Sequence, residues 1–129
     1  MTKVFLLTAT LLLATTVLAA DTMPPGVKTE KSASGASVLA DAKGMTLYTF
    51  DKDTAGKSVC NGPCAKNWPP LMATGTSAMD MGEWTVVTRD DGSKQWAYKG
   101  KPLYTWVKDT QPGQTTGDGV GSVWHTATP

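Results

Sequence analysis

Two groups of side chains in this sequence have the types and the spacing to do chemistry. They lie in the stretches LYTFDKDT and LYTWVKDT, and they are Tyr48, Phe50 and Asp53 in the first and Tyr104, Trp106 and Asp109 in the second. An aromatic ring offers a face for stacking or for a cation, and a carboxylate accepts hydrogen bonds. Each group is therefore a candidate for a shallow site that binds a small polar ligand or a cation, or that contacts a partner.

The same residues also predict a structural motif. Alternation along a strand places Tyr48 and Phe50 on one face and Leu47 and Thr49 on the other. Asp53 follows the strand, where its carboxylate can accept backbone N–H groups within the turn 51–56 or the hydroxyl proton of a tyrosine. A duplicated fold keeps its turn chemistry in both copies, so the structural role is our first expectation.

A second candidate site is the cysteine pair Cys60 and Cys64 in CNGPC. In an exported chain the default prediction is a disulfide, and closing so short a loop contributes at most about 2 kcal/mol. The alternative is a copper site in which the two thiolates and the sole histidine, His125, bind Cu(I). That would make the chain a periplasmic copper or redox accessory protein, although the chain lacks the βαβ pattern of thioredoxin-like copper chaperones.

The signals for catalysis are weak. A hydrolase needs a Ser/His/Asp triad or two acids placed across a cleft. A triad would have to use His125, and no G-x-S-x-G motif is present. We therefore predict that the protein is not an enzyme and requires no cofactor.

The N-terminal residues predict export. Lys3 precedes an apolar run from Val4 to Leu18, and the small residues Ala19 and Ala20 close it, which is typical of a signal peptide spanning residues 1–20. The rest of the chain has no apolar run long enough to span a membrane. Without Lys3 its basic and acidic residues are equal in number, which argues against nucleic acid and anionic membranes as partners. We expect a periplasmic or secreted protein.

An internal duplication organises the remaining chain. A shift of 56 residues aligns, without a gap, Lys43–Gly44 with Lys99–Gly100, Leu47–Thr49 with Leu103–Thr105, and Trp68 with Trp124. Self-similarity of this extent indicates a repeated structural unit.

The predicted fold is all-β. Strands are expected at 27–31, 37–42, 45–50, 83–88, 95–98 and 102–106, separated by Gly-containing turns. They would form two duplicated three-stranded meanders packed as one small β-sandwich or open barrel. A short Cys-linked loop or helical turn at 64–68 is stopped by Pro69–Pro70.

The predicted domain organisation follows from these strands. Residues 21–36 form a polar leader and first-strand region, and residues 37–129 form a single β-domain. Its two repeats span about 37–70 and 83–126, and the stretch 69–82 links the halves.

The two LYT stretches, together with CNGPCAKNWPPL and GKPLY, resemble the bacterial secreted-repeat family of predicted lipoproteins with the motif Y-x-[FWY]-x-x-D. The resemblance spans residues 38–124. It implies an exported, repeat-built envelope protein whose biochemical role is largely unassigned. This chain lacks the lipid-attachment cysteine, which favours a free form. We therefore expect a non-enzymatic binding or interaction module, with an envelope protein or a small ligand as its partner.

Overall fold

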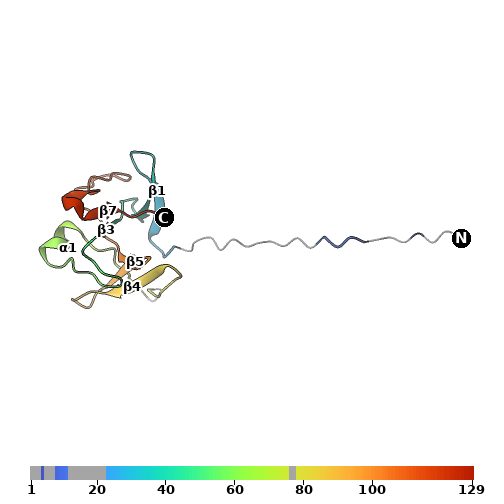
Figure 1. The fold of residues 1–129 in the computed structure, drawn as a ribbon, viewed down its shortest axis with the longest axis horizontal. Coiled ribbons are helices and arrows are strands. Elements are labelled where there is room, and N and C mark those ends of the chain that lie inside the picture. The colour runs from blue at the N-terminus through green and yellow to red at the C-terminus, as the bar shows by residue number, and fades with distance from the viewer. Residues whose placement is uncertain (1–3, 5–7, 12–22, 76–77) are drawn as a thin grey trace.

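The computed structural model describes residues 4, 8–11, 23–75 and 78–129 (Figure 1). The signal peptide predicted for residues 1–20 lies mostly outside these residues and stays a prediction. Within the described ranges, no helix has the length and apolar character needed to cross a membrane.

The described chain is nearly all β, which confirms the predicted fold class. Its elements in order are β1 (Val27–Lys31), β2 (Ser37–Asp41), β3 (Tyr48–Phe50), α1 (Pro63–Asn67), β4 (Trp84–Thr88), β5 (Lys94–Tyr98), β6 (Lys101–Pro102), the 3-10 turn η1 (Val120–Ser122) and β7 (Trp124–Thr126). The strands form three small antiparallel sheets: β1–β2, β3–β7 and β4–β5–β6.

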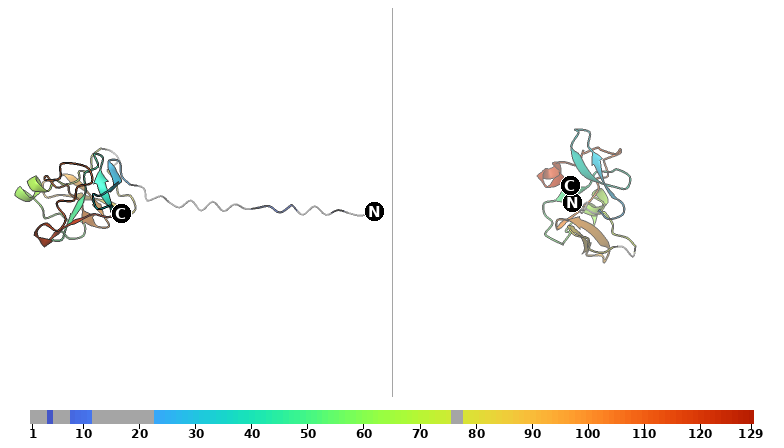
Figure 2. Two further views of the ribbon diagram at one scale, coloured as in Figure 1. Left: turned by 90° about the horizontal axis from the view of Figure 1, so that it is seen from above. Right: turned by 90° about the vertical axis from the view of Figure 1, so that its right-hand side faces the viewer.

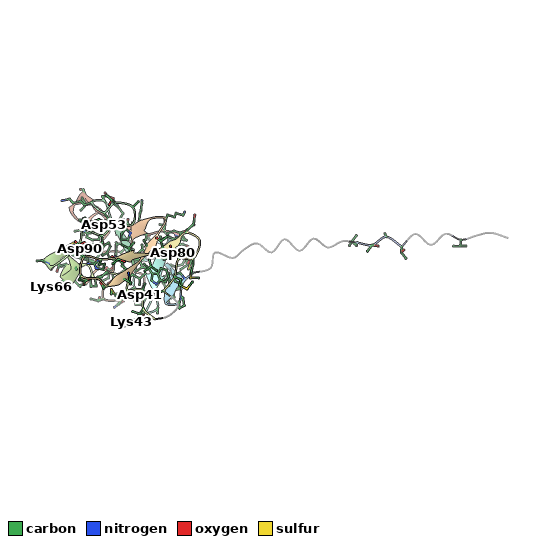
Figure 3. All side chains as sticks on the ribbon, turned by 90° about the horizontal axis from the view of Figure 1, so that it is seen from below. Asp41, Lys43, Asp53, Lys66, Asp80 and Asp90 are labelled. Carbon is green, nitrogen blue, oxygen red and sulfur yellow. A yellow bond between two sulfur atoms is a disulfide. The ribbon has the colours of Figure 1, made fainter. Side chains whose placement is uncertain are left out.

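Each repeat begins with a hairpin. The β1–β2 and β4–β5 hairpins lie on opposite sides of the folded body, with β3 and β7 between them (Figures 1 and 2). After β5 the chain turns through Lys99 and Gly100, which both have positive φ (51° and 81°), as a two-residue hairpin turn of type I′ requires. The corresponding turn after β2 is one residue longer, and there Asp41 accepts the N–H groups of Lys43 and Met45. Asp41 and Lys43 are labelled in Figure 3.

The third strand of each repeat starts in its own hairpin and then crosses to the other repeat. The N–H groups of Leu47 and Leu103 still donate to their own hairpins, at 2.9 and 3.0 Å. One residue later, Tyr48 and Tyr104 pair with each other and exchange both backbone hydrogen bonds, at 2.8 and 3.0 Å. The two repeats are therefore joined at the tyrosines of their motifs.

The end of the second repeat completes the sheet of the first. Strand β7 pairs with β3, and the next residue, Ala127, lies between Leu39 and Leu47. The Ala127 N–H donates to the Leu47 carbonyl, and the Ala127 carbonyl accepts from Leu39, both at 2.8 Å.

The end of the first repeat does the same for the second. Leu71 donates to the Leu103 carbonyl at 2.8 Å and accepts from the Trp96 N–H at 2.9 Å, and Met72 forms a bridge with Gln95. Residues 71–73, which belong to the stretch predicted to link the halves, therefore also form part of the β5 sheet. The repeats exchange their closing segments.

Two clusters of buried side chains follow from this crossing. The first contains Leu39, Leu47, Ala73, Trp84, Trp96, Leu103 and Ala127, and the second contains Tyr48, Cys60, Trp68, Tyr104 and Trp124. Leu47 and Tyr48 are adjacent, so alternation sends their side chains to opposite faces and into different clusters. Both faces of the crossing strand are buried.

The helical turn lies one residue earlier than expected. Helix α1 starts at Pro63, in a position that a proline favours, and ends at Asn67 just before Pro69. Lys66, near its C-terminal end, points away from the body (Figure 3). The predicted disulfide between Cys60 and Cys64 is present and anchors this helix to the preceding loop.

Candidate functional site

The tyrosine of each motif bonds the aspartate of the other motif. The Tyr48 hydroxyl donates to Asp109 Oδ2 and the Tyr104 hydroxyl donates to Asp53 Oδ2, each at 2.5 Å. Both tyrosine side chains are fully buried. They therefore face inward and hold the two repeats together.

The other carboxylate oxygen of each aspartate closes a loop. Asp53 Oδ1 accepts the Val59 N–H at 2.8 Å, and Asp109 Oδ1 accepts the N–H and the hydroxyl of Thr116 at 3.0 and 2.6 Å. The expected backbone bond within the turn 51–56 is wrong, because Val59 lies beyond that turn. The expected tyrosine bond to Asp53 is present, with a tyrosine from the other repeat.

Burial keeps both phenols neutral. It raises the pKa of Tyr48 and of Tyr104, and the hydrogen bonds to Asp109 and Asp53 raise these pKa values further. Burial also raises the pKa of Asp53, against the opposing effects of its hydrogen bonds and of the Arg89 charge.

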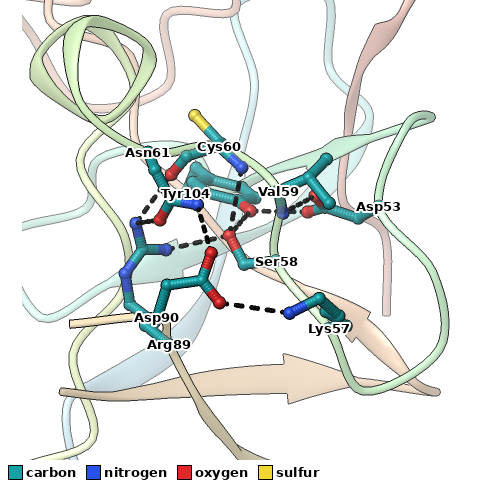
Figure 4. Close-up of polar contacts among 9 residues, drawn as sticks. All are labelled: Asp53, Lys57, Ser58, Val59, Cys60, Asn61, Arg89, Asp90 and Tyr104. Carbon is teal, nitrogen blue, oxygen red and sulfur yellow. Dashed lines mark hydrogen bonds and ion pairs between the residues drawn. The ribbon is translucent and has the colours of Figure 1, made fainter. Parts of the chain in front are cut away.

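A buried cation extends only one of the two pairs. Arg89 is 5% exposed, and its guanidinium donates to Ser58 Oγ at 3.0 Å, Gln95 Oε1 at 2.7 Å and the Cys60 carbonyl at 2.6 Å. Because Tyr104 gives its proton to Asp53, the Ser58 hydroxyl donates to the Tyr104 oxygen, at 2.6 Å (Figure 4). The network makes the two halves chemically different.

Four aromatic rings stack one on another through the second cluster, and this stack is called the aromatic file below. Their order is Trp106, Trp68, Trp124 and Phe50, with ring centroids 3.9, 3.8 and 4.2 Å apart. The two inner indoles are buried, and the two outer rings, which belong to the predicted site residues, are half-buried. The motif aromatics thus occupy the two ends of one stack.

A cavity of about 250 Å³ lies where the repeats meet at β3 and β6. Its charged and apolar lining includes Phe50, Asp51 and Asp53 from the first repeat and Lys99, Lys101 and Pro102 from the second. Two of the predicted site residues, Phe50 and Asp53, therefore share one hollow. Tyr48, Tyr104, Trp106 and Asp109 are not part of this lining.

The residues of the copper alternative are occupied by other bonds. Cys60 and Cys64 are joined as a disulfide, and His125 Nε2 lies 2.7 Å from Asp51 Oδ2. In the part of the chain that the structure describes, no group of three or more His, Cys, Asp or Glu side chains could hold a metal ion. The copper site stays a hypothesis without support from this geometry.

Comparison with known families covers both repeats. Residues 28–72 and 85–128 match the model of a family described as a secreted repeat of unknown function. The chain belongs to this family. The resemblance inferred from its motifs is thus confirmed, and a secreted location for this secreted-repeat protein is supported. No curated protein and no solved structure matches it.

Three residues of the hydrogen-bond network and the cavity lining were not predicted from the sequence. Arg89 could have been noticed as the sole arginine of the chain, but nothing local indicated that it is buried. Lys99 and Lys101 read as parts of a turn, and their place beside Phe50 depends on the crossing of the repeats.

Proposed function

We propose that this secreted-repeat protein is a non-enzymatic binding module of the periplasm or the extracellular space. Its ligand site is the cavity between β3 and β6, and its ligand is a small zwitterionic molecule. The observation that supports this proposal is the lining, where charges of both signs surround the half-buried ring of Phe50.

The charged groups of the lining differ in exposure. Both Asp53 oxygens accept hydrogen bonds from the protein, from Tyr104 and Val59. Lys99 and Lys101 are exposed, and so is Asp51, whose Oδ2 lies 2.7 Å from His125 Nε2. A ligand could therefore place an anionic group against the lysines and a cationic group near Asp51. Ligand pockets usually measure about 300–1,000 Å³, so this cavity suits a molecule of few heavy atoms.

The backbone of Lys99 adds support. Its φ of 51° lies in the left-handed region, which costs an L-residue about 1–2 kcal/mol. Asparagine and glycine fit this turn position better. A strained lysine is understandable if its side chain is needed, and it lines the cavity while its Nζ lies 5.1 Å from the Tyr98 ring.

The motif carboxylates support a role without catalysis. Asp53 and Asp109 each accept at least two hydrogen bonds from the protein itself. A general base has to reach a substrate proton, and these oxygens are already engaged. Their role is to hold loops and repeats in place.

The proposal can be tested by titrating the purified mature chain with a panel of amino acids and betaines while recording amide NMR spectra. We expect shifts clustered at residues 49–55 and 99–102. Lys99→Ala should weaken binding about tenfold to a hundredfold, as expected for one lost charge-assisted hydrogen bond.

The matched control is Lys43→Ala, which changes the lysine at the corresponding turn of the first repeat, away from the cavity lining. It should bind as the parent does. Binding of no zwitterion in the panel, or equal affinity of Lys99→Ala and the parent, would refute the proposal.

A further inference from the structure

The aromatic file and the tyrosine–aspartate pairs form one connected system. Trp68 and Trp124 stack within 3° of parallel, with centroids 3.8 Å apart, and Trp106 stacks on Trp68 at 3.9 Å. Rings in such contact share overlapping π faces, so a positive hole formed on one indole can move to the next by a short electron transfer.

Each inner indole also meets one motif tyrosine. The Tyr48 ring lies edge-on to Trp68 with centroids 5.4 Å apart, and the Tyr104 ring lies edge-on to Trp124 at 5.2 Å. A phenol that loses an electron becomes strongly acidic, so it must hand its proton to a base within hydrogen-bond reach. Asp109 and Asp53 are such bases, each 2.5 Å from its phenol oxygen.

Only one end of the file suits the exchange of electrons with the outside. Trp106 and Phe50 are the half-buried ends, and an indole gives up an electron far more readily than a benzene ring. Trp68 and Trp124 are each 4% exposed, and both tyrosines are fully buried. An oxidant in solution therefore reaches the file through Trp106.

The charges around the file favour movement inward. Lys108 Nζ lies 5.6 Å from the Trp106 ring centroid and raises the energy of a positive hole there. The buried Asp109 carboxylate, beside Tyr48, lowers the energy of positive charge on that phenol. A hole made at Trp106 thus gains energy by moving toward the tyrosines.

We propose that this protein is a one-electron relay, which carries the oxidising equivalent of an oxygen-centred radical from Trp106 through Trp68 to Tyr48. The radical gains one electron from Trp106 and becomes an anion, which takes a proton from water. Trp106 regains its electron from Trp68, and Trp68 regains its own from Tyr48. The O–H bond of Tyr48 breaks, its proton moves to Asp109, and a neutral tyrosyl radical remains.

A parallel branch runs from Trp68 through Trp124 to Tyr104 and Asp53. The path to Tyr48 uses no residue of the cavity lining and is independent of ligand binding there, whereas Asp53 of the parallel branch lines the cavity. In the second motif, the relay gives Tyr104, Trp106 and Asp109 one step each.

The experiment uses the full mature chain in a Tyr98→Phe background, so that Tyr48 and Tyr104 are the only tyrosines left. A one-electron oxidant is generated by a laser flash from a ruthenium tris-bipyridine complex with a quencher. Transient absorption then distinguishes tryptophan radicals from tyrosyl radicals, and freeze-quench paramagnetic resonance confirms the assignment. We expect a short-lived tryptophan radical followed by a tyrosyl radical.

Two tryptophan variants test the path. Trp106→Phe should slow the formation of the tyrosyl radical and lower its yield. The matched control Trp84→Phe, which changes a buried indole of the other cluster, should leave both unchanged. Trp106 is half-buried, so its variant should fold, and near-ultraviolet circular dichroism would verify this.

Asp109→Asn with Asp53→Asn removes both proton acceptors and should leave the radical on tryptophan. Three results would overturn the proposal: a radical that stays on tryptophan in the Tyr98→Phe protein, equal rates in the Trp106→Phe and Trp84→Phe variants, or an unchanged tyrosyl yield without the two carboxylates.

Discussion

The hydrogen bonds between repeats predict a specific pattern of energetic coupling. Tyr48 bonds Asp109, and Tyr104 bonds Asp53, each at 2.5 Å. Removing the tyrosine hydroxyl and removing the carboxylate of one pair should therefore have non-additive effects on the free energy of unfolding. The variants are Tyr48→Phe, Asp109→Ala and the double variant, with the corresponding set for the second pair.

The expected magnitude follows from the contacts. A hydrogen bond to a charged group contributes about 1.5–3 kcal/mol. Tyr48→Phe also takes away the acceptor of the Gly117 N–H, 3.2 Å from the phenol oxygen. We expect Tyr48→Phe to lower the unfolding free energy by about 2–4 kcal/mol. For a domain of this size, Tm should fall by about 4 °C for each kcal/mol.

The assay is equilibrium urea denaturation of all single and double variants, with the m-value checked for constancy. The coupling energy of each pair between repeats should be about 1.5–3 kcal/mol. The matched control pairs each tyrosine with the aspartate of its own motif, Tyr48 with Asp53 and Tyr104 with Asp109. Those effects should add to within about 0.5 kcal/mol.

The exchange of partners between repeats would be refuted if a tyrosine were coupled to the aspartate of its own motif. It would also be refuted if the effects of Tyr48→Phe and Asp109→Ala on the unfolding free energy were additive. Tyr98→Phe reports the loss of a phenol outside these pairs. Among the described residues its hydroxyl makes no side-chain hydrogen bond, so its effect should be small.

Three further results are expected. Burial raises the pKa of Tyr48 and of Tyr104 above the unfolded value of about 10, so above that pH the folded state binds more protons than the unfolded state. The free energy of unfolding should therefore fall by up to about 1.4 kcal/mol per pH unit for each tyrosine. Urea midpoints measured from pH 8 to 11 would check this. Gly117→Ala would place a Cβ 2.8 Å from the Trp68 ring and should cost about 1–3 kcal/mol by overpacking, measured by thermal unfolding. Thiol titration of the denatured protein should find no free thiol before reduction. Reduction of the disulfide should lower the free energy of unfolding by no more than about 2 kcal/mol. Two free thiols in the native protein would instead favour the copper alternative.

The elements of the fold were predictable because their signals are local. Residues 27–31 and 84–88 show strand composition, and Lys99–Gly100 marks a tight turn. The disulfide followed from the short spacing of its cysteines in a chain whose N-terminal residues predict export. Each of these features depends on residues a few positions apart.

The exchange of partners was not predictable, because the repeats make it ambiguous. The sequence offers Tyr48 two equivalent aspartates, one in its own motif and one in the other. The alternation of a strand predicts the face on which a side chain lies, but not the strand that it contacts. The segment that follows Pro69–Pro70 was also hidden. Prolines cannot donate backbone hydrogen bonds, so the two prolines made the stretch look like a linker, although Leu71 and Ala73 donate to Leu103 and Lys94.

Arg89 shows a different limit of sequence reasoning. Arginine is seldom fully buried unless it is paired, and Arg89 directly follows strand β4. Its burial depends on four acceptors from a loop and a strand that the sequence does not place together.

The exchanged closing segments also determine when this chain can finish folding. The Leu39 N–H donates to the carbonyl of Ala127, which lies far along the chain from the first hairpin. Contacts so distant in sequence close late and slow the search for the native state. The first hairpin is therefore incompletely covered until residues 124–127 pair with it. A protein built in this way completes its first sheet in a late step of folding.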